Sequence, residues 1–332
     1  MAHEVPNNPR ANTMSTSDSN RQPDTSATQS TCPRRDFLKA AGTASVAVVA
    51  GHALAADKPA AQQTTLPQIR FGKQTISRLV CGNNTFAGGS HLSSFVNHEM
   101  KTFFTEEQIF KTLRRCEEQG ITVWQAGPGN IDAYRRYLDS GGKIQFLAIA
   151  GNTVKEIEKL AKGGCIGMAH HGEATDSCFK QGKLDQIHDC LKRVRDSGMM
   201  VGVSTHMPDV VDAIESKGWD LAYYMTCIYE RHRSETDLQK LLGHVPLPVG
   251  EVYLKSDPPR MFKMVRQTKR ICLAFKILAA GRLCDRHDLV EQAFRDTFAA
   301  IKPSDGVIVG IYDRYTDQVA ENAAFVRKFG TV

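Results

Sequence analysis

Several features that would assign a function at once are missing from this sequence. No apolar run approaches the roughly 18 residues that a membrane-spanning helix needs. None of the nine cysteines forms a CxxC pair, and no basic run is interleaved with aromatic residues, although the formal net charge is +6. The missing apolar run argues against a transmembrane domain, and the missing basic run argues against a nucleic-acid-binding surface.

The cysteines carry information about where the chain folds. Several lie in apolar runs, such as Val80-Cys81 and Ile271-Cys272-Leu273, where a thiol behaves as a small core residue. Buried free thiols are unusual in a protein that folds in an oxidising compartment. We therefore expect folding in the cytoplasm, even if the chain is exported afterwards.

The N-terminal segment has the organisation of an export signal. Residues 1–31 are rich in Ser, Thr, Asn and Pro and are predicted to be disordered. Arg34-Arg35-Asp36-Phe37-Leu38-Lys39 precedes an Ala/Val/Gly run, and Ala53-Leu54-Ala55 offers a small-x-small cleavage site. Paired arginines in this context indicate a twin-arginine signal over residues 1–55. The predicted partner is the twin-arginine translocase, and the predicted location is the periplasm or the cell exterior.

The remaining chain alternates short apolar runs with amphipathic stretches, after a linker over residues 56–68. This alternation predicts βα units and a parallel sheet, and unbroken apolar runs indicate strands that are covered on both faces. Eight such units within residues 69–330 predict a single (β/α)8 TIM barrel. The predicted strands are Ser77–Cys81, Ile121–Ala126, Ile144–Ala150, Cys165–Ala169, Met200–Val203, Leu221–Tyr229, Ile271–Leu278 and Gly306–Ile311.

A doubly wound sheet is the rival fold. Such sheets usually carry a glycine-rich GxGxxG phosphate loop after the first strand. Here the first strand is followed by Cys81-Gly82-Asn83-Asn84-Thr85-Phe86, which lacks this pattern. The barrel is therefore the favoured architecture.

Five segments in order resemble the aldo/keto reductase superfamily. They are Phe71–Gly82, Glu118–Thr122, Val201–His206, Ala279–Leu283, and Val307–Gly310 with Gln318–Asn322. The resemblance implies a barrel enzyme with a nicotinamide cofactor, NAD(P), which an exported enzyme would have to hold tightly. It also implies that Ser204, Glu321 and Asn322 bind this cofactor.

The catalytic residues of that family are mostly absent. The family transfers hydride with an Asp, a Tyr, a Lys and a His, of which the Tyr protonates the carbonyl oxygen. The first three positions fall on Gln125, on or near Asn130, and near Ala150 or Gly151. Only the His has counterparts, His170 and His171. The resemblance therefore predicts the fold, while the usual reductase mechanism lacks its proton donor.

Polar residues gather at the predicted carboxyl ends of the strands, where active sites of this fold lie. The candidate catalytic residues are His170, His171, Lys276 and Gln125; a lysine in an apolar strand acquires a lowered pKa and can act as a base or a Schiff-base former. Amide-rich surroundings suit hydroxyl groups, so a carbohydrate-like substrate is expected. The candidate substrate-binding residues are Asn83, Asn84, Asn130, His206 and Tyr229.

Three functions remain open at this point. The first is an exported oxidoreductase that acts on a carbohydrate-like carbonyl or hydroxyl compound. The second is a non-redox isomerase, lyase or hydrolase on the same barrel. It would use His170 or His171, His206 and Glu173 as acids and bases or as ligands of a divalent metal. The third is a sugar-binding pseudoenzyme without catalytic activity.

Overall fold

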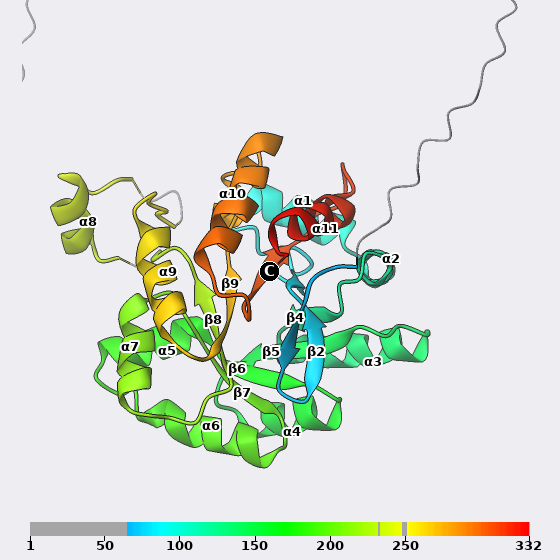
Figure 1. The fold of residues 1–332 in the computed structure, drawn as a ribbon, viewed down its shortest axis with the longest axis horizontal. Coiled ribbons are helices and arrows are strands. Elements are labelled where there is room, and N and C mark those ends of the chain that lie inside the picture. The colour runs from blue at the N-terminus through cyan, green and yellow to red at the C-terminus, as the bar shows by residue number, and fades with distance from the viewer. Residues whose placement is uncertain (1–64, 232, 248–250, 332) are drawn as a thin grey trace, which may run out of the picture. The chain divides into compact units, whose positions relative to one another are not determined.

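The computed structural model describes residues 65–231, 233–247 and 251–331. Eight parallel strands close into a barrel in the order β10-β3-β4-β5-β6-β7-β8-β9 (Figure 1). The chain is therefore a (β/α)8 barrel, which confirms the fold expected from the apolar runs. The barrel strands are β3 (Leu79–Gly82), β4 (Val123–Ala126), β5 (Gln145–Ala150), β6 (Gly167–His170), β7 (Met200–Thr205), β8 (Tyr223–Cys227), β9 (Ile271–Phe275) and β10 (Gly306–Gly310).

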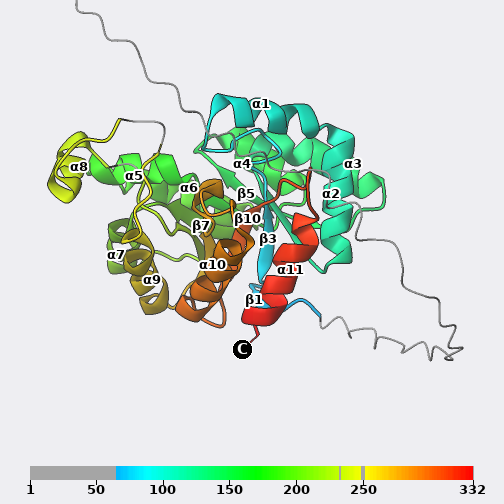
Figure 2. The ribbon, with the colours of Figure 1, turned by 90° about the horizontal axis from the view of Figure 1, so that it is seen from above.

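Helices surround the barrel and connect successive strands (Figure 2). The strands are consequently buried on both faces, which explains why their sequences are apolar rather than alternating. The helices are α1 (Ser94–Phe103), α2 (Glu106–Glu118), α3 (Ile131–Asp139), α4 (Val154–Lys162), α5 (Gly172–Lys180), α6 (Gln186–Asp196), α7 (Pro208–Ser216), α8 (Glu235–Leu242), α9 (Asp257–Gln267), α10 (His287–Ala300) and α11 (Gln318–Phe329), with single 3-10 turns η1 (Pro128–Asn130) and η2 (Ala279–Gly281).

Local sequence signals set the helix ends, as α2 illustrates. The Thr105 hydroxyl accepts a hydrogen bond from the backbone N–H of Gln108 at 3.2 Å, which caps the first turn. Glu106 and Glu107 lie in that turn, where negative charge is favourable. Gly120 follows the helix with a φ of 84°, a conformation that glycine adopts without strain. These signals account for both ends of α2.

A β-hairpin closes the amino ends of the barrel strands. It consists of β1 (Gln68–Phe71) and β2 (Gln74–Ser77), and its apolar side chains join the cluster that fills the barrel lumen. The Phe71 ring lies 4.9 Å from the ring of Tyr223, centroid to centroid, inside the barrel. At the hairpin turn, a Cβ on Gly72 would meet the Met200 sulfur at 2.6 Å, so the turn packs closely against the start of β7.

Two helices were not expected from the sequence. α1 lies in the connection between β3 and α2, and α5 follows β6 directly. Both are short and carry few buried apolar residues, so their apolar periodicity is weak. The strand expected over Leu221–Tyr229 is shortened to β8. The placement of α5 matters because this helix carries Asp176.

The predicted signal and most of the predicted linker lie outside the described residues. Among the residues that are described, no helix is both long enough and apolar enough to cross a membrane.

Candidate active site at the carboxyl ends of the barrel strands

Strand alternation determines which side chains face the lumen near its upper end. Val123 of β4 and Ala169 of β6 belong to the apolar cluster that fills the lumen. Because alternate residues of a strand point to the same side, Gln125 and His171 also face inward, one layer nearer the carboxyl ends. The same alternation places Ser204, His206 and Phe275 on the lumen side.

Lys276 follows Phe275 directly, after the end of β9, so the alternation of the strand does not extend to it. Its Nζ lies 5.4 Å from the centroid of the Phe275 ring and 3.1 Å from His91 Nε2. Among the described residues, no carboxylate oxygen lies within 4.0 Å of this nitrogen. The backbone of Lys276 is left-handed, with a φ of 60°, and Ala279 and Ala280 in the following turn are left-handed as well. Strained backbone of this kind is concentrated at functional sites.

Burial changes the protonation of Lys276. It lowers the pKa of the ammonium from 10.5 to about 8, because the charged form loses its hydration; the positive charges of Arg231 and Arg282 lower it further, while Cys227 and Glu173 oppose the shift. A large fraction of Lys276 is therefore an uncharged amine near pH 8. An uncharged amine is a nucleophile, whereas an ammonium is not.

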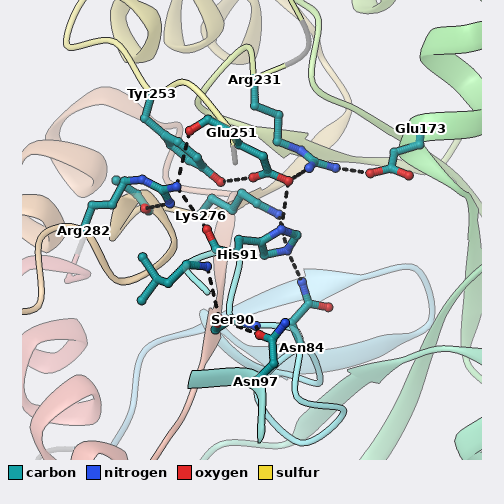
Figure 3. Close-up of polar contacts among 12 residues, drawn as sticks. Asn84, Ser90, His91, Asn97, Glu173, Arg231, Glu251, Tyr253, Lys276 and Arg282 are labelled. Atoms are coloured by element: carbon teal, nitrogen blue, oxygen red, sulfur yellow. Dashed lines mark hydrogen bonds and ion pairs between the residues drawn. The ribbon is translucent and has the colours of Figure 1, made fainter. Parts of the chain in front are cut away.

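His91 connects Lys276 to a group of charged residues (Figure 3). Its Nε2 lies 3.0 Å from Asn84 Nδ2 and 3.1 Å from Lys276 Nζ, and its Nδ1 lies 2.9 Å from Glu251 Oε1. Because both neighbours of Nε2 are nitrogen donors, Nε2 accepts and Nδ1–H donates to Glu251. Burial lowers the pKa of His91 to about 3, so its ring is neutral at physiological pH.

The remaining charged residues close the mouth above Lys276 (Figure 3). Arg231 forms ion pairs with Glu173 and Glu251, and the Tyr253 hydroxyl donates to Glu251 Oε2 at 2.5 Å. Arg282 donates to the carbonyl oxygens of His91 and Glu251 at 3.0 and 3.3 Å, and its guanidinium lies 4.1 Å from the Tyr253 ring centroid. We call His91, Arg231, Glu251, Tyr253 and Arg282 the mouth cluster.

A buried carboxylate and imidazole form a second reactive pair. Asp176 Oδ2 lies 2.8 Å from His206 Nδ1, and both side chains are about 95% buried. The same carboxylate accepts from the backbone N–H of His206 at 3.1 Å and from the Thr205 hydroxyl at 2.5 Å. This fixes His206 as the Nδ1–H tautomer, so its Nε2 carries the lone pair. The arrangement is that of a histidine base oriented by a carboxylate.

The protonation of His206 is set by two opposing effects. Burial lowers its pKa to about 4, although Asp176 opposes this shift; the positive charges of Arg231 and Lys276 lower the pKa as well. His206 is therefore neutral at physiological pH and can accept a proton. The His206 ring lies 5.6 Å from the ring of Phe275, centroid to centroid, and Phe275 precedes Lys276 in the chain.

The two predicted histidines of β6 have different surroundings. His170 points away from the lumen, and its Nδ1 and Nε2 lie 2.7 Å from Thr175 Oγ1 and 2.5 Å from Asn152 Oδ1. Both ring nitrogens are thus occupied, and this geometry indicates a structural role. His171, next along the chain, faces the lumen and occupies the N-cap position of α5, where its side chain makes no capping hydrogen bond. The catalytic prediction of the sequence is better supported for His171 than for His170.

The predicted substrate-binding residues are brought together in part. Asn83 Nδ2 donates to Asn130 Oδ1 at 3.3 Å, and Asn83 Oδ1 is buried without a hydrogen-bond partner in the described part of the chain. Asn84 contacts His91, and Tyr229 packs against Tyr253 with 5.1 Å between ring centroids. Asn84 and Tyr229 therefore contact the mouth cluster, whereas Asn83 and Asn130 contact each other.

The predicted cofactor-binding residues are also placed by the structure. Ser204 lies on the lumen side of β7, and its hydroxyl oxygen is buried without a hydrogen-bond partner among the described residues. On α11, Asn322 is buried and Glu321 is exposed. Within the described ranges, no three His, Cys, Asp or Glu side chains are grouped closely enough to hold a metal ion.

Sequence reasoning missed several residues of the site. Asp176 lies on helix α5, which the sequence did not predict, so no sequence pattern indicated its contact with His206. The residues of the mouth cluster come from the loop after β3, the loop after β8, the segment before α9 and the turn η2. Arg282 did lie in a segment that the sequence singled out, Ala279–Leu283. Arg231 could have been found from the sequence, because it is a charged residue shortly after a buried strand.

Comparison with known proteins gives similarity of structure at low identity. No protein-family model matches the chain, and no curated protein matches it in sequence. A truncated 3-deoxy-D-arabino-heptulosonate 7-phosphate synthase from Thermotoga maritima is 14% identical, with 80% of this chain and 91% of that chain covered and a TM-score of 0.46. Two aldo-keto reductases are each 12% identical over 80% of this chain and 97% of theirs: AKR11C1 from Bacillus halodurans in its holo form, with a TM-score of 0.46, and the glycerol dehydrogenase AKR11B4 from Gluconobacter oxydans, with a TM-score of 0.44.

Proposed function

We propose that this chain is an enzyme that acts on a small, carbohydrate-like carbonyl compound through covalent catalysis by Lys276. The observation that carries the proposal is a partly buried lysine directly after a barrel strand, with a pKa of about 8 and no carboxylate partner among the described residues. An ordinary structural lysine of this burial would be paired with an acid. Lysines lowered in this way form Schiff bases with carbonyl substrates.

The reaction begins with attack of the neutral Lys276 amine on the carbonyl carbon. A C–N bond forms and the C–O bond breaks. The carbonyl oxygen takes one proton from the amine nitrogen and one from solvent and leaves as water, and an iminium ion remains on Lys276. The positive iminium withdraws electrons from the neighbouring carbon and makes its C–H bond acidic. His206 accepts that proton at Nε2, while Asp176 stabilises the imidazolium ion that results.

The surroundings of Lys276 support this chemistry. Phe275 and the apolar lumen below it limit hydration of the amine. The mouth cluster lies beside the amine, and Lys276 is left only partly exposed to solvent (Figure 3). A dry site keeps the pKa of Lys276 low and protects an iminium from hydrolysis.

Reductive trapping tests the proposal. The protein is incubated with glyceraldehyde, dihydroxyacetone or D-glucuronate and sodium cyanoborohydride, and the modified lysines are identified by peptide mass spectrometry. We expect preferential modification of Lys276 over the exposed Lys111, and no such site in Lys276→Met. Modification of surface lysines while Lys276 stays unmodified would contradict covalent catalysis. It would favour a binding protein or a redox enzyme.

The second candidate is an oxidoreductase that uses NAD(P), as the family resemblance implies. The buried, unpartnered hydroxyl of Ser204 favours it, because a polar ligand in the lumen would satisfy this group. Bound NAD(P) would supply the hydride, and Ser204, Glu321 and Asn322 would hold the cofactor. Native mass spectrometry of the purified protein separates the candidates: a mass increment of one dinucleotide supports the redox enzyme, and its absence after incubation with NAD(P) contradicts it.

We further propose that the chain is exported in folded form by the twin-arginine translocase. The support is the sequence motif around Arg34 and Arg35, together with buried free cysteines such as Cys81, Cys116 and Cys272. Replacement of both arginines by lysine should retain the protein in the cytoplasm of a bacterial host. Unchanged export of that variant would contradict the proposed route.

A further inference from the structure

Side chains of the mouth cluster form a binding site for a carboxylate, which we call the receptor. In this structure the carboxylate of Glu251 occupies it. Its Oε1 accepts from His91 Nδ1 at 2.9 Å and pairs with Arg231, and its Oε2 accepts from the Tyr253 hydroxyl at 2.5 Å. Arg282 lies beside it and donates to the backbone carbonyl of Glu251. Donors thus converge on a single carboxylate at the mouth of the candidate active site (Figure 3).

The hydrogen-bonding capacity of this receptor exceeds what Glu251 uses. The Arg231 side chain is 5% exposed, yet its Nε is buried without a hydrogen-bond partner among the described residues. A buried guanidinium N–H that lacks a partner is costly, and a planar carboxylate can accept from two guanidinium nitrogens at once. A differently placed carboxylate could therefore satisfy Arg231 better than Glu251 does.

The charge around the receptor also favours an added anion. The positive charges of Arg231 and Arg282 both act on Lys276, and that of Arg231 also acts on His206. Glu173 and Glu251 are the acids that pair with Arg231. If the Glu251 side chain moves away from Arg231, the positive charges of Arg231 and Arg282 near Lys276 lose part of their compensation. The acid group of a substrate would restore it.

On the basis of the proposed function, we propose that the natural substrate is a sugar acid whose carboxylate displaces Glu251 from Arg231 while its carbonyl carbon reaches Lys276. One imidazole ring and two hydrogen bonds separate Glu251 Oε1 from Lys276 Nζ, so the two positions lie within about 8 Å of each other. That span suits a six-carbon acid with its carbonyl and carboxylate at opposite ends. A carboxylate is favoured over a phosphate because the resident group is itself a carboxylate.

The test is a binding measurement, which does not depend on catalysis. Isothermal titration calorimetry compares D-glucuronate and D-galacturonate with the neutral sugars D-glucose and D-galactose and with their 6-phosphates, on the wild type and on Lys276→Met. We expect at least one acid to bind both proteins at least ten-fold more tightly than its neutral sugar and its 6-phosphate. Equal affinity of acid and neutral sugar, preference for a phosphate, or binding of neither acid would overturn the inference.

Matched variants locate the acid group. Glu251→Gln removes the competing charge and should tighten binding of the acid about ten-fold without changing that of the neutral sugar. Glu230→Gln makes the same chemical change in a different cluster, with Arg233 and Arg260, and should leave both affinities unchanged. The assignment would be contradicted if neither variant bound the acid more tightly than the wild type, or if both gained affinity equally. Thermal melts confirm that each variant is folded.

The two proposals can fail separately. An acid preference without reductive trapping on Lys276 would retain the acid receptor and remove covalent catalysis. Trapping on Lys276 without an acid preference would retain the catalytic lysine and overturn the substrate class.

Discussion

The two ends of the barrel are closed by opposite kinds of side chain. At the amino ends of the strands, the β1–β2 hairpin inserts Ile69, Phe71 and Ile76 into the apolar lumen cluster. At the carboxyl ends, the mouth cluster closes the barrel with two arginines, a glutamate, a histidine and a tyrosine. Apolar closure contributes stability in proportion to the area that it buries. Ionic closure recovers little beyond its desolvation cost, and its partners can be exchanged for those of a ligand.

This contrast assigns different roles to the two ends. The hairpin is permanent structure, since its removal would expose apolar surface in the lumen. The mouth cluster is a polar cover that a substrate can replace, and the reactive amine lies directly beneath it. Substitutions at the two ends should therefore separate loss of function from loss of stability.

The largest expected effect is that of Lys276→Met on catalysis. In deuterium oxide, the wild type should exchange the hydrogen next to the carbonyl of a compound that traps on Lys276, and the variant should lose this exchange by more than about 10³-fold. Stability should not fall, because a thioether replaces a buried amine. Exchange followed by NMR together with urea unfolding checks both; retained exchange would contradict the assignment.

The next effect is at the opposite end of the barrel. Phe71→Ala removes a fully buried ring that packs on Tyr223, and should lower the free energy of unfolding by about 3–5 kcal/mol. Under conditions where the variant remains folded, its trapping on Lys276 should resemble that of the wild type. A stable variant with impaired trapping would break the division of roles between the two ends.

The Asp176–His206 pair should give a smaller loss. Asp176→Asn keeps the size of the side chain but no longer orients and stabilises His206 as a base, so the hydrogen–deuterium exchange rate should fall about 10²-fold. Trapping on Lys276 should persist, because formation of the C–N bond does not require this base. If exchange and trapping fall together, the pair supports the fold rather than proton transfer.

The smallest effect is on the pH dependence of stability. The folded state holds Lys276 at a pKa of about 8, and the unfolded chain holds it near 10.5. Between these values the unfolded state binds more protons, so stability should rise with pH from about 8 to 10.5, and Lys276 should add no slope below pH 8. Urea unfolding of the wild type minus that of Lys276→Met isolates this contribution. An equal slope in both proteins would show that Lys276 has an ordinary pKa.

The sequence was sufficient for the barrel and for part of the site. Eight apolar runs could be recognised because strands covered on both faces need no polar alternation, and Lys276 was conspicuous because it interrupts one such run. The partners of these residues could not be recognised. His91 lies 185 positions from Lys276, and Asp176 lies 30 positions before His206 on a helix with little apolar periodicity. Such pairings depend on barrel closure and on loop conformation, neither of which leaves a local pattern.

The central claim is that the pKa of Lys276 is lowered to about 8, so that a large fraction of it is an uncharged amine near that pH. A titration of that amine tests the claim without knowledge of the substrate. Protein labelled with ¹³C at the lysine ε carbon is followed by ¹H–¹³C NMR from pH 6 to 11, and Lys276→Met identifies the resonance. We predict a midpoint near pH 8, set by burial beneath the mouth cluster. A midpoint above pH 10, as for an exposed lysine, would contradict the claim and with it the proposed covalent catalysis.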